Sequence, residues 1–424
     1  MQRFVKTALA SLSVMAIGIS PVGASAPKTI KAPATVSVKG TTVVKVTAAT
    51  AKSYKGAGPY HVGIMTFDER VAGTTLTPAG YTTKVDCWYP TLAIGTSSIY
   101  NMSQWLPAPI AFIVNNNPAA KTIATYPTGG IAKAAVAPGK FPLVLFSHGY
   151  GGFRDQSAGI TSHLASWGFV VCAPDHLGRN LTAQLDPTVG LTPPTSDPNA
   201  DVNDLSTLQA QLKANKVAAL KGHVDVTRVV ALGHSAGGSA SERLASYATS
   251  LKASGTWLKG FIGMAGMSGL NWSQAVAPFN TIPTQPGYIL SGDNDITVPT
   301  ATLQTAFASL KAKSTMTVLS GAGHNVFSDI CVIGQGSGGI LAIAAALNVS
   351  VPDNLANLAT DGCKSPNRPV LDDLGVIGQI TVAAARSMNG QDAGRPTTTG
   401  LVAAYPGLVV STSRVGGGAG VTTE

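Results

Sequence analysis

One short stretch of this chain carries the residues best suited to covalent chemistry. Residues 229–238 read VVALGHSAGG, so an aliphatic run stops at Gly233, and Ser235 follows before two more glycines. The pattern G-x-S-x-G is typical of a strand that ends in a sharp turn and opens a helix. The turn holds the serine in a strained backbone conformation, and the glycines let neighbouring chain pass close by. We therefore predict that Ser235 is a nucleophile; the simpler alternative is a glycine-rich turn with an incidental serine.

A serine nucleophile needs a histidine base, and the histidine needs an acid to orient it. After a turn of this kind, the expected chain order is serine, acid, histidine. His324 lies in the glycine-rich segment GAGHN that follows the last strand-like run, which is where the base is expected. Two other histidines fit worse, because His176 precedes Ser235 in the chain and the side chain of His234 should point away from it.

The acid is expected in a turn after a later strand. Residues 288–299 read YILSGDNDITVP and contain two aspartates. We favour Asp295 because it lies deeper in the loop, where its carboxylate can turn toward the histidine. Asp293 is more typical of a residue that stabilises its own turn.

An attacked carbonyl group develops negative charge on its oxygen, which backbone N–H groups can stabilise. One donor is expected from Ala236, directly after the nucleophile, and the other from the loop after the first parallel strand. That loop reads HGYGG at residues 148–152, and we assign the N–H of Tyr150 to this role. The side chain of His148 is expected to support the loop by hydrogen bonding.

Strands and helices that could position these residues alternate from residue 142 onward. Strand-like runs lie at 143–147, 169–173, 228–232, 260–265, 288–291 and 316–319, and helical patterns at 155–167, 201–219, 237–250 and 300–312. This alternation indicates an α/β fold with a mostly parallel central sheet and helices on both faces. Two earlier runs, 61–67 and 84–89, have no helix between them and predict antiparallel strands at an edge.

The rest of the chain divides into segments of different character. Arg3 and Lys6 precede an apolar run and a small-residue pattern that ends at Ala24, which predicts a signal peptide over residues 1–24. We expect a loosely ordered extension over 25–58, the core over 59–327, a helical C-terminal part of the same domain over 328–393 and a flexible tail over 394–424.

The composition is of a kind that is common in exported proteins. Of 424 residues only 12% are charged, about half the usual share. The net charge is +9, but the basic residues are scattered, which argues against nucleic-acid binding and leaves transient contact with anionic lipid surfaces.

The four cysteines show no zinc-binding spacing. Cys331 and Cys363 flank a loop-rich segment and are predicted to pair, because an oxidising compartment favours disulfides. Cys87 and Cys172 lie in apolar strand-like runs, where they are either buried thiols or a second bridge.

Several segments together resemble a known family. They are PLVLFSHGYGGFR at 142–154, LASWGFVVCAPDH at 164–176, GHSAGG at 233–238, and GPYHVG at 58–63 followed by WYP at 88–90. From about residue 58 to 327 the chain resembles the platelet-activating-factor acetylhydrolase and dienelactone hydrolase group of the α/β-hydrolase superfamily.

The resemblance implies the α/β-hydrolase fold and ester hydrolysis without a metal or cofactor, often on short or oxidised acyl chains. It assigns Ser235, Asp295 and His324 as the catalytic triad, with Tyr150 and Ala236 as oxyanion donors. Dienelactone hydrolases proper use a cysteine nucleophile, whereas this chain has a serine. The chain departs from the group's pattern in the proline-rich segment 186–199 and beyond residue 327.

The sequence thus predicts a secreted serine carboxylester hydrolase that forms an acyl-enzyme with short-chain or lipid-derived esters. A lipase or polyesterase with the same triad is the first alternative, although the absence of a strong amphipathic lid pattern argues against a long-chain lipase. A catalytically silent binding protein on the same scaffold is the second alternative.

Overall fold

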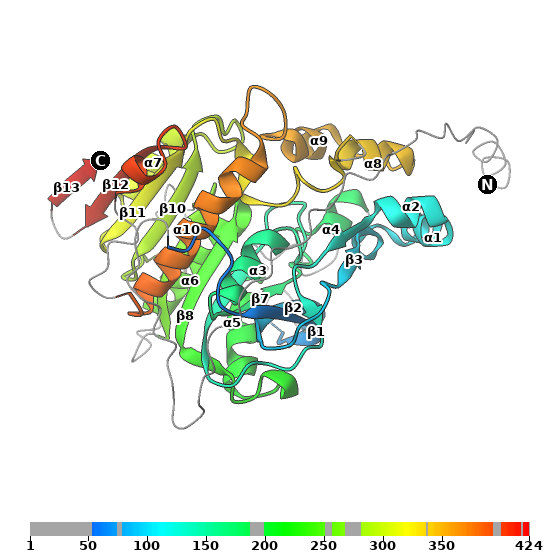
Figure 1. Ribbon diagram of the computed structural model, residues 1–424, viewed down its shortest axis with the longest axis horizontal. Helices are drawn as coiled ribbons and strands as arrows, with labels where there is room; N and C mark the ends of the chain where they lie inside the picture. Colours follow the sequence, from blue (N-terminus) through cyan, green and yellow to red (C-terminus); the bar gives the residue numbers. More distant parts are fainter. Residues whose placement is uncertain are drawn as a thin grey trace. The chain divides into compact units, whose positions relative to one another are not determined.

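An 11-stranded sheet organises the part of the chain that the structure describes (Figure 1). The computed structural model describes residues 53–73, 79–186, 199–250, 257–267, 281–335, 338–392, 400–416 and 419–423. The signal peptide predicted over 1–24 and most of the proline-rich segment 186–199 lie outside these residues.

The strands of the large sheet follow the order β13-β12-β11-β10-β9-β8-β6-β7-β2-β1-β5. Their bounds are β1 (His61–Val71), β2 (Tyr81–Thr91), β5 (Ile131–Ala132), β6 (Phe141–Ser147), β7 (Val170–Pro174), β8 (Val224–His234), β9 (Leu258–Met264), β10 (Gly287–Gly292), β11 (Ser314–Leu319), β12 (Val409–Gly416) and β13 (Ala419–Thr423). The strands from β7 through β6, β8, β9 and β10 to β11 pair in parallel, whereas β1, β2 and β7 pair antiparallel, as do β11, β12 and β13. The predicted mostly parallel sheet with antiparallel N-terminal strands is therefore confirmed.

Helices cover both faces of this sheet. The helices of the described residues are α1 (Ala108–Asn116), α2 (Pro118–Ile123), α3 (Ala158–Ser166), α4 (Leu181–Leu185), α5 (Ala200–Lys213), α6 (Ala236–Ser250), α7 (Thr300–Ala308), α8 (Ile340–Ala346), α9 (Asp353–Thr360), α10 (Val370–Met388) and α11 (Leu401–Ala404), with short 3-10 turns η1 (Met102–Trp105), η3 (Ala218–Leu220) and η4 (His324–Phe327). Helices α3 and α10 pack on one face, and α5, α6 and α7 pack on the other.

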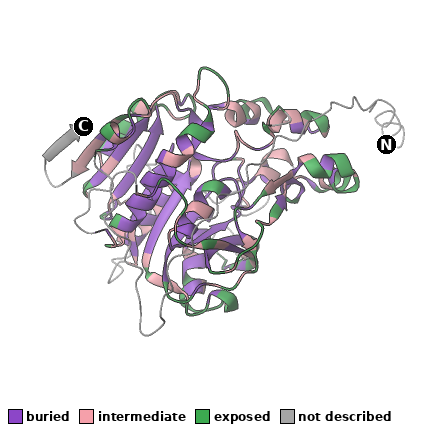
Figure 2. Ribbon diagram, viewed as in Figure 1, coloured by how far each residue is buried: buried purple, intermediate pink, exposed green. Residues whose placement is uncertain are grey.

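The central strands are buried on both sides, because successive side chains point to opposite faces. In β6, Val144 and Phe146 join the cluster under α3 and α10, while Leu143 and Leu145 join the cluster under α5 and α6. Figure 2 shows these strands buried over most of their length. Such a rigid layer can hold loops at its carboxyl edge in fixed positions.

A third apolar cluster lies outside the two sheet faces. It joins the segment 100–126, which contains η1, α1 and α2, to residues 330–347, which contain α8. The first segment also forms a two-stranded sheet of β3 (Ile99–Asn101) and β4 (Thr125–Pro127). The irregular region 91–139 is therefore packed against the C-terminal part of the domain.

Two boundary predictions differ from the structure. Residues 409–416 were expected in a flexible tail, but β12 pairs antiparallel with β11, since this edge of the sheet offers unpaired backbone groups. The N-terminal extension was expected to reach residue 58, but Tyr54 is fully buried. Its N–H donates to Gln379 on α10 (2.6 Å) and its hydroxyl to Asp392 (2.7 Å), so the chain is anchored earlier than its composition indicates.

All four cysteines of the chain are bridged. Cys331 pairs with Cys363, as expected from the sequence. Cys87 on β2 lies opposite Cys172 on β7 in the antiparallel register, and the two form the second bridge. The sheet register decides between the two alternatives that the sequence left open for this pair.

Candidate active site

Ser235 occupies the sharp turn between β8 and α6. Its backbone φ is +56°, a left-handed conformation that a non-glycine residue rarely adopts. A Cβ at Gly233 would lie 2.1 Å from the carbonyl oxygen of Gly237, and a Cβ at Gly237 would lie 1.9 Å from that of Ser147. These two glycines are therefore required for the turn, as the sequence pattern predicts. The N–H of Ser235 donates to the carbonyl of Met264 on β9 (2.8 Å), which ties the turn to the sheet.

Asp295 and His324 form a buried pair beside this turn. The Nδ1 of His324 and Oδ2 of Asp295 are 2.9 Å apart, and Oδ1 accepts a hydrogen bond from the N–H of Val298 (2.7 Å). Asp293, by contrast, is exposed and accepts from the N–H of Gly321 (2.6 Å). The structure thus brings Asp295 to the histidine and gives Asp293 a role in its own turn.

The other ring nitrogen of His324 takes no part in the contact with Asp295. Its Nε2 is buried and has no hydrogen-bond partner among the described residues. His324 and Ser235 line the same cleft, although no hydrogen bond joins Nε2 to the serine hydroxyl within this part of the chain. Such contacts are often long in the absence of substrate and shorten in the reacting complex.

Three of the four N–H groups of residues 149–152, in the loop after β6, have partners within the protein. The N–H groups of Gly149, Gly151 and Gly152 bond to Gln156 Oε1 (3.0 Å), Arg179 O (2.8 Å) and Gly149 O (3.1 Å). The N–H of Tyr150 has no partner among the described residues, and Tyr150 lines the cleft. Ala236 is the first residue of α6, where backbone N–H groups have no acceptor within the helix.

The side chains of His148 and Arg179 stabilise this loop by hydrogen bonds. The Nδ1 of His148 lies 2.8 Å from Gly149 O, and Nε2 accepts a hydrogen bond from the N–H of His176 (2.9 Å), as expected for a supporting residue. Burial lowers the pKa of His148 well below its usual value, so the ring stays neutral and can accept that bond. Arg179 Nη2 donates to Ser147 Oγ (2.7 Å) and to His148 O (2.8 Å).

His234 and Gln156 form a further supporting chain that the sequence analysis missed. Gln156 Nε2 lies 2.8 Å from His234 Nδ1, and His234 Nε2 lies 2.9 Å from the carbonyl oxygen of His324. Burial, together with the neighbouring His324, lowers the pKa of His234 to about 3. His234 is thus a neutral ring that, through Gln156, connects the loop after β6 to the backbone of His324. Its place inside the G-x-S-x-G motif was the available signal, but only the fold shows what its ring contacts.

The cleft over Ser235 is lined mainly by apolar side chains. It encloses about 960 Å³, its open mouth included. Leu181 on α4, Ile343 on α8 and Leu355 and Leu358 on α9 line its walls. Among the described residues that line it there is no Lys, Arg, Asp or Glu. Helices α8 and α9 both follow residue 327, so the C-terminal part of the domain supplies part of the wall.

Three buried groups lie close enough together for a metal ion to be considered. Donor atoms of Asp295, His324 and Asp361 all lie within 4.8 Å of one another. Each already has protein partners, since Asp295 bonds to His324 Nδ1 and Asp361 accepts hydrogen bonds from both neighbouring loops. The arrangement is that of a hydrogen-bond network around the histidine.

The fold and the site define a carboxylester hydrolase of the α/β-hydrolase type. Residues 129–349 match the dienelactone hydrolase family, and residues 47–186 match platelet-activating factor acetylhydrolase, isoform II. Since the first match covers more than half of the chain, the protein belongs to the dienelactone hydrolase family.

A solved structure shares this architecture. The chain is similar to a ferulic acid esterase from Streptomyces cinnamoneus, with a TM-score of 0.53 and 20% sequence identity over 77% of this chain and 89% of that one. This is a likeness of fold, and it supports the α/β-hydrolase assignment made from the resemblance.

Proposed function

We propose that this protein is a secreted serine carboxylester hydrolase that acts through an acyl-enzyme intermediate on esters with an apolar acyl group. The observation that carries the proposal is the buried 2.9 Å contact between His324 Nδ1 and Asp295, with Nε2 left unpartnered in the cleft that Ser235 lines. A Ser–His–Asp arrangement of this kind is the general means of activating a hydroxyl for attack on a carbonyl carbon.

In the proposed mechanism, Ser235 Oγ attacks the ester carbonyl carbon while His324 Nε2 accepts the hydroxyl proton. The N–H groups of Tyr150 and Ala236 stabilise the oxyanion of the tetrahedral intermediate. Collapse of the intermediate breaks the bond to the alcohol oxygen, which takes the proton from His324. Water then attacks the acyl-enzyme with His324 again acting as base. Collapse of this second intermediate breaks the bond to Ser235 Oγ, which takes the proton back from His324, and the carboxylic acid is released.

The lining of the cleft supports an apolar acyl group. A charged substrate group would lose its hydration there without gaining an ion-pair partner, since no charged side chain is found among the lining residues described. Each buried methylene contributes about 0.8 kcal/mol, or roughly a four-fold gain in kcat/KM.

A panel of p-nitrophenyl esters from C2 to C16 tests the proposal. We expect kcat/KM to rise from acetate to at least hexanoate, and Ser235→Ala to lose activity by several orders of magnitude. Ser250→Ala, at the far end of the same helix, is the matched control and should behave as wild type. Undiminished hydrolysis by Ser235→Ala would refute the nucleophile assignment, and a maximum at acetate would refute the apolar acyl site.

A lipase is the second candidate, and helices α8 and α9 favour it. They place apolar side chains over the cleft in a region where the sequence showed no strong amphipathic lid pattern. A lipase should have its maximum at long chains, with rates that rise sharply above the solubility limit of the substrate. A maximum between C4 and C8, with no such rise, would favour the esterase. Labelling of wild type by a fluorophosphonate separates both enzymes from a silent binding protein.

Export is supported by the N-terminal pattern and by the two disulfides, since such bridges persist in oxidising compartments. In the described part of the chain, no helix combines the length and apolar character needed to cross a membrane. We propose that residues 1–24 are removed on export. N-terminal sequencing of the exported protein should then begin at Ser25, and an uncleaved Met1 terminus would contradict the proposal.

A further inference from the structure

One carboxylate outside the proposed triad contacts both loops that carry the acid and the base. Asp361 directly follows α9 and is buried. Its Oδ1 accepts a hydrogen bond from the N–H of His324 (3.3 Å). Its Oδ2 accepts from the N–H of Thr297 (2.9 Å), the hydroxyl of Thr297 (2.7 Å) and the N–H of Ile296 (3.2 Å). Ile296 and Thr297 follow Asp295 directly, so one side chain connects the two loops.

The backbone around Asp361 packs tightly against the loop that carries the base. A Cβ at Gly323 would lie 2.3 Å from the Cα of Gly362, and Gly362 has a φ of +90°. The carbonyl of Asp361 also accepts a hydrogen bond from the N–H of Asn325 (3.0 Å). Backbone thus meets backbone on both sides of His324, which leaves little freedom in the position of the imidazole.

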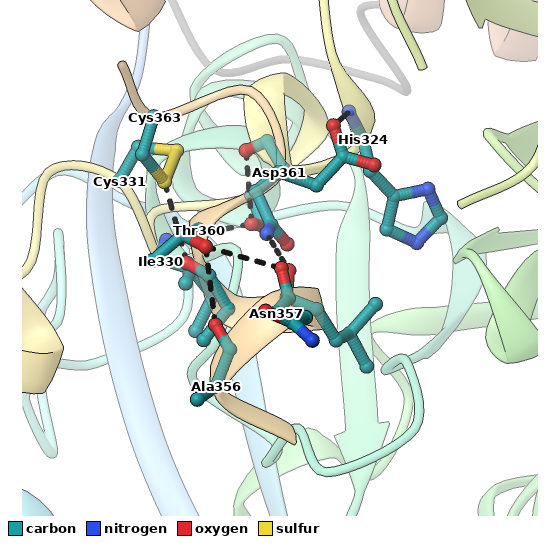
Figure 3. Close-up of a disulfide and its surroundings, with 12 residues drawn as sticks. His324, Ile330, Cys331, Ala356, Asn357, Thr360, Asp361 and Cys363 are labelled. Carbon is teal, nitrogen blue, oxygen red and sulfur yellow. Dashed lines mark hydrogen bonds between the residues drawn. A yellow bond between two sulfur atoms is a disulfide. The ribbon is translucent and has the colours of Figure 1, made fainter. Parts of the chain in front are cut away.

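A disulfide bridge closes this arrangement. Cys363 lies two residues after Asp361 and is bonded to Cys331, a few residues beyond the turn η4 that begins with His324. Figure 3 shows Asp361 between the bridge and His324. Without the bridge, the covalent path from Asp361 to His324 would run only through a long stretch of chain that contains α8 and α9.

We propose that Asp361 is a positioning residue for the Asp295–His324 pair, held in place by the Cys331–Cys363 bridge. The inference rests on the proposed function of Ser235, Asp295 and His324. Asp295 follows β10 and His324 follows β11, so their side chains are carried by separate loops. A reacting geometry must be held to within about 0.5 Å, and a misplacement of about 1 Å can cost roughly a hundred-fold in rate.

A carboxylate suits this position because it accepts hydrogen bonds at both oxygens and donates none. An asparagine would turn its NH₂ group toward either the His324 N–H or the N–H groups of residues 296 and 297. One of the two loops would then lose its contact and move relative to the other. The expected result is a slower chemical step with little change in how the substrate binds.

Asp361→Asn and Asp361→Ala test this inference with the p-nitrophenyl butyrate assay. We expect kcat to fall by roughly ten- to a hundred-fold while KM stays within about three-fold of wild type. Asp353→Asn is the matched control, because Asp353 is an exposed aspartate at the opposite end of α9. It should keep kcat within about two-fold of wild type. Thermal unfolding curves establish that each variant is folded at the assay temperature.

A double-mutant cycle with Asp295→Asn separates positioning from general stability. If Asp361 acts through the Asp295–His324 pair, its replacement should cost less than about three-fold in the Asp295→Asn background, measured as the rate of fluorophosphonate labelling. Equal losses in both backgrounds would mean that Asp361 only stabilises the fold and would overturn the inference. Asp361 variants within two-fold of wild type would also overturn it.

Milder changes keep the test usable if both Asp361 variants fail to fold. Thr297→Val removes only the hydroxyl contact, and replacing Cys331 and Cys363 by serine removes only the bridge. Both changes should lower kcat several-fold in the wild-type background and cost less when Asp295 is already replaced by asparagine. An unchanged kcat in both variants would contradict the inference. Wild type without Ser235-dependent hydrolysis would refute the proposed function itself, whereas active wild type with unchanged Asp361 variants would refute this inference alone.

Discussion

Replacing Asp295 by asparagine is expected to lower kcat for ester hydrolysis by about a thousand- to ten-thousand-fold. The same replacement at Asp293, two residues earlier, should leave kcat within about two-fold of wild type. The two changes remove one negative charge each from the same loop, so their difference isolates the contact with the histidine.

The magnitude follows from the donors around each carboxylate. Asp295 faces two N–H groups, from His324 Nδ1 (2.9 Å) and from Val298 (2.7 Å), and an amide can accept only one of them through its oxygen. If the amide oxygen keeps the Val298 contact, its NH₂ group faces His324 and favours the tautomer with the proton on Nε2. That tautomer cannot accept the serine proton. The expected loss corresponds to about 4 to 5.5 kcal/mol of transition-state stabilisation.

Asp293 lacks this constraint. It is exposed and has one backbone contact, to the N–H of Gly321 (2.6 Å), which an asparagine oxygen can also accept. The assay is kcat and KM with p-nitrophenyl butyrate, supported by fluorophosphonate labelling rates and circular dichroism. An Asp295→Asn variant that keeps a tenth or more of the wild-type kcat would refute the assignment. A large loss at Asp293 instead would mean that the acid lies there.

Three further predictions concern stability. Gly237→Ala should prevent correct folding of the elbow and abolish labelling, because the new Cβ would lie 1.9 Å from a backbone carbonyl of β6, whereas Gly56→Ala, with no atom within 4 Å, should be tolerated. Burial, with Asp204 nearby, raises the pKa of Glu69 to about 9, so the folded state keeps a proton that the unfolded state loses and stability falls between pH 4.5 and 9. Glu69→Gln should shrink the difference in unfolding free energy between pH 5 and pH 8 by roughly 2 to 4 kcal/mol in denaturant titrations; an unchanged difference would contradict this. Replacing Cys87 and Cys172 by alanine should lower stability by about 2 to 5 kcal/mol, because the bridge closes a separation of 85 residues; a melting temperature equal to that of wild type would argue against it.

Local sequence was enough to locate the elbow. Gly233 and Gly237 are required by backbone atoms only a few residues away or on the adjacent strand, and such short-range steric demands leave a recognisable pattern. The position of His324 could also be predicted, because it follows the last parallel strand in a glycine-rich segment. The bridge between Cys331 and Cys363 was predicted from the loop-rich segment that these cysteines flank.

The contact between Asp361 and the loop of His324 could not be predicted from the sequence. It lies in no motif and follows His324 by 37 positions. The predicted bridge between Cys331 and Cys363 was the one sequence feature that could have placed this segment close to His324. A side chain recruited from so far along the chain is identified only when the fold brings the segments together.

The tail illustrates the same limit for secondary structure. Residues 394–424 are rich in Gly, Thr and Val and show no pattern that demands order. Residues 409–416 nevertheless form β12, because β11 presents an open edge whose N–H and C=O groups need partners. A strand of this kind is stabilised by its neighbour and not by its own sequence.

The sequence by itself determined the alternation of strands and helices and the chain order serine, acid, histidine, from which we predicted the chemistry proposed for this protein. The tertiary structure decided which aspartate meets the histidine, that Cys87 and Cys172 are bridged, and that α8 and α9 form an apolar wall over the cleft. The physical reason is how far apart in the sequence the interacting residues lie. Turns and nucleophile geometry depend on neighbours along the chain, whereas hydrogen-bond partners, disulfide register and cleft lining depend on segments that meet only after folding.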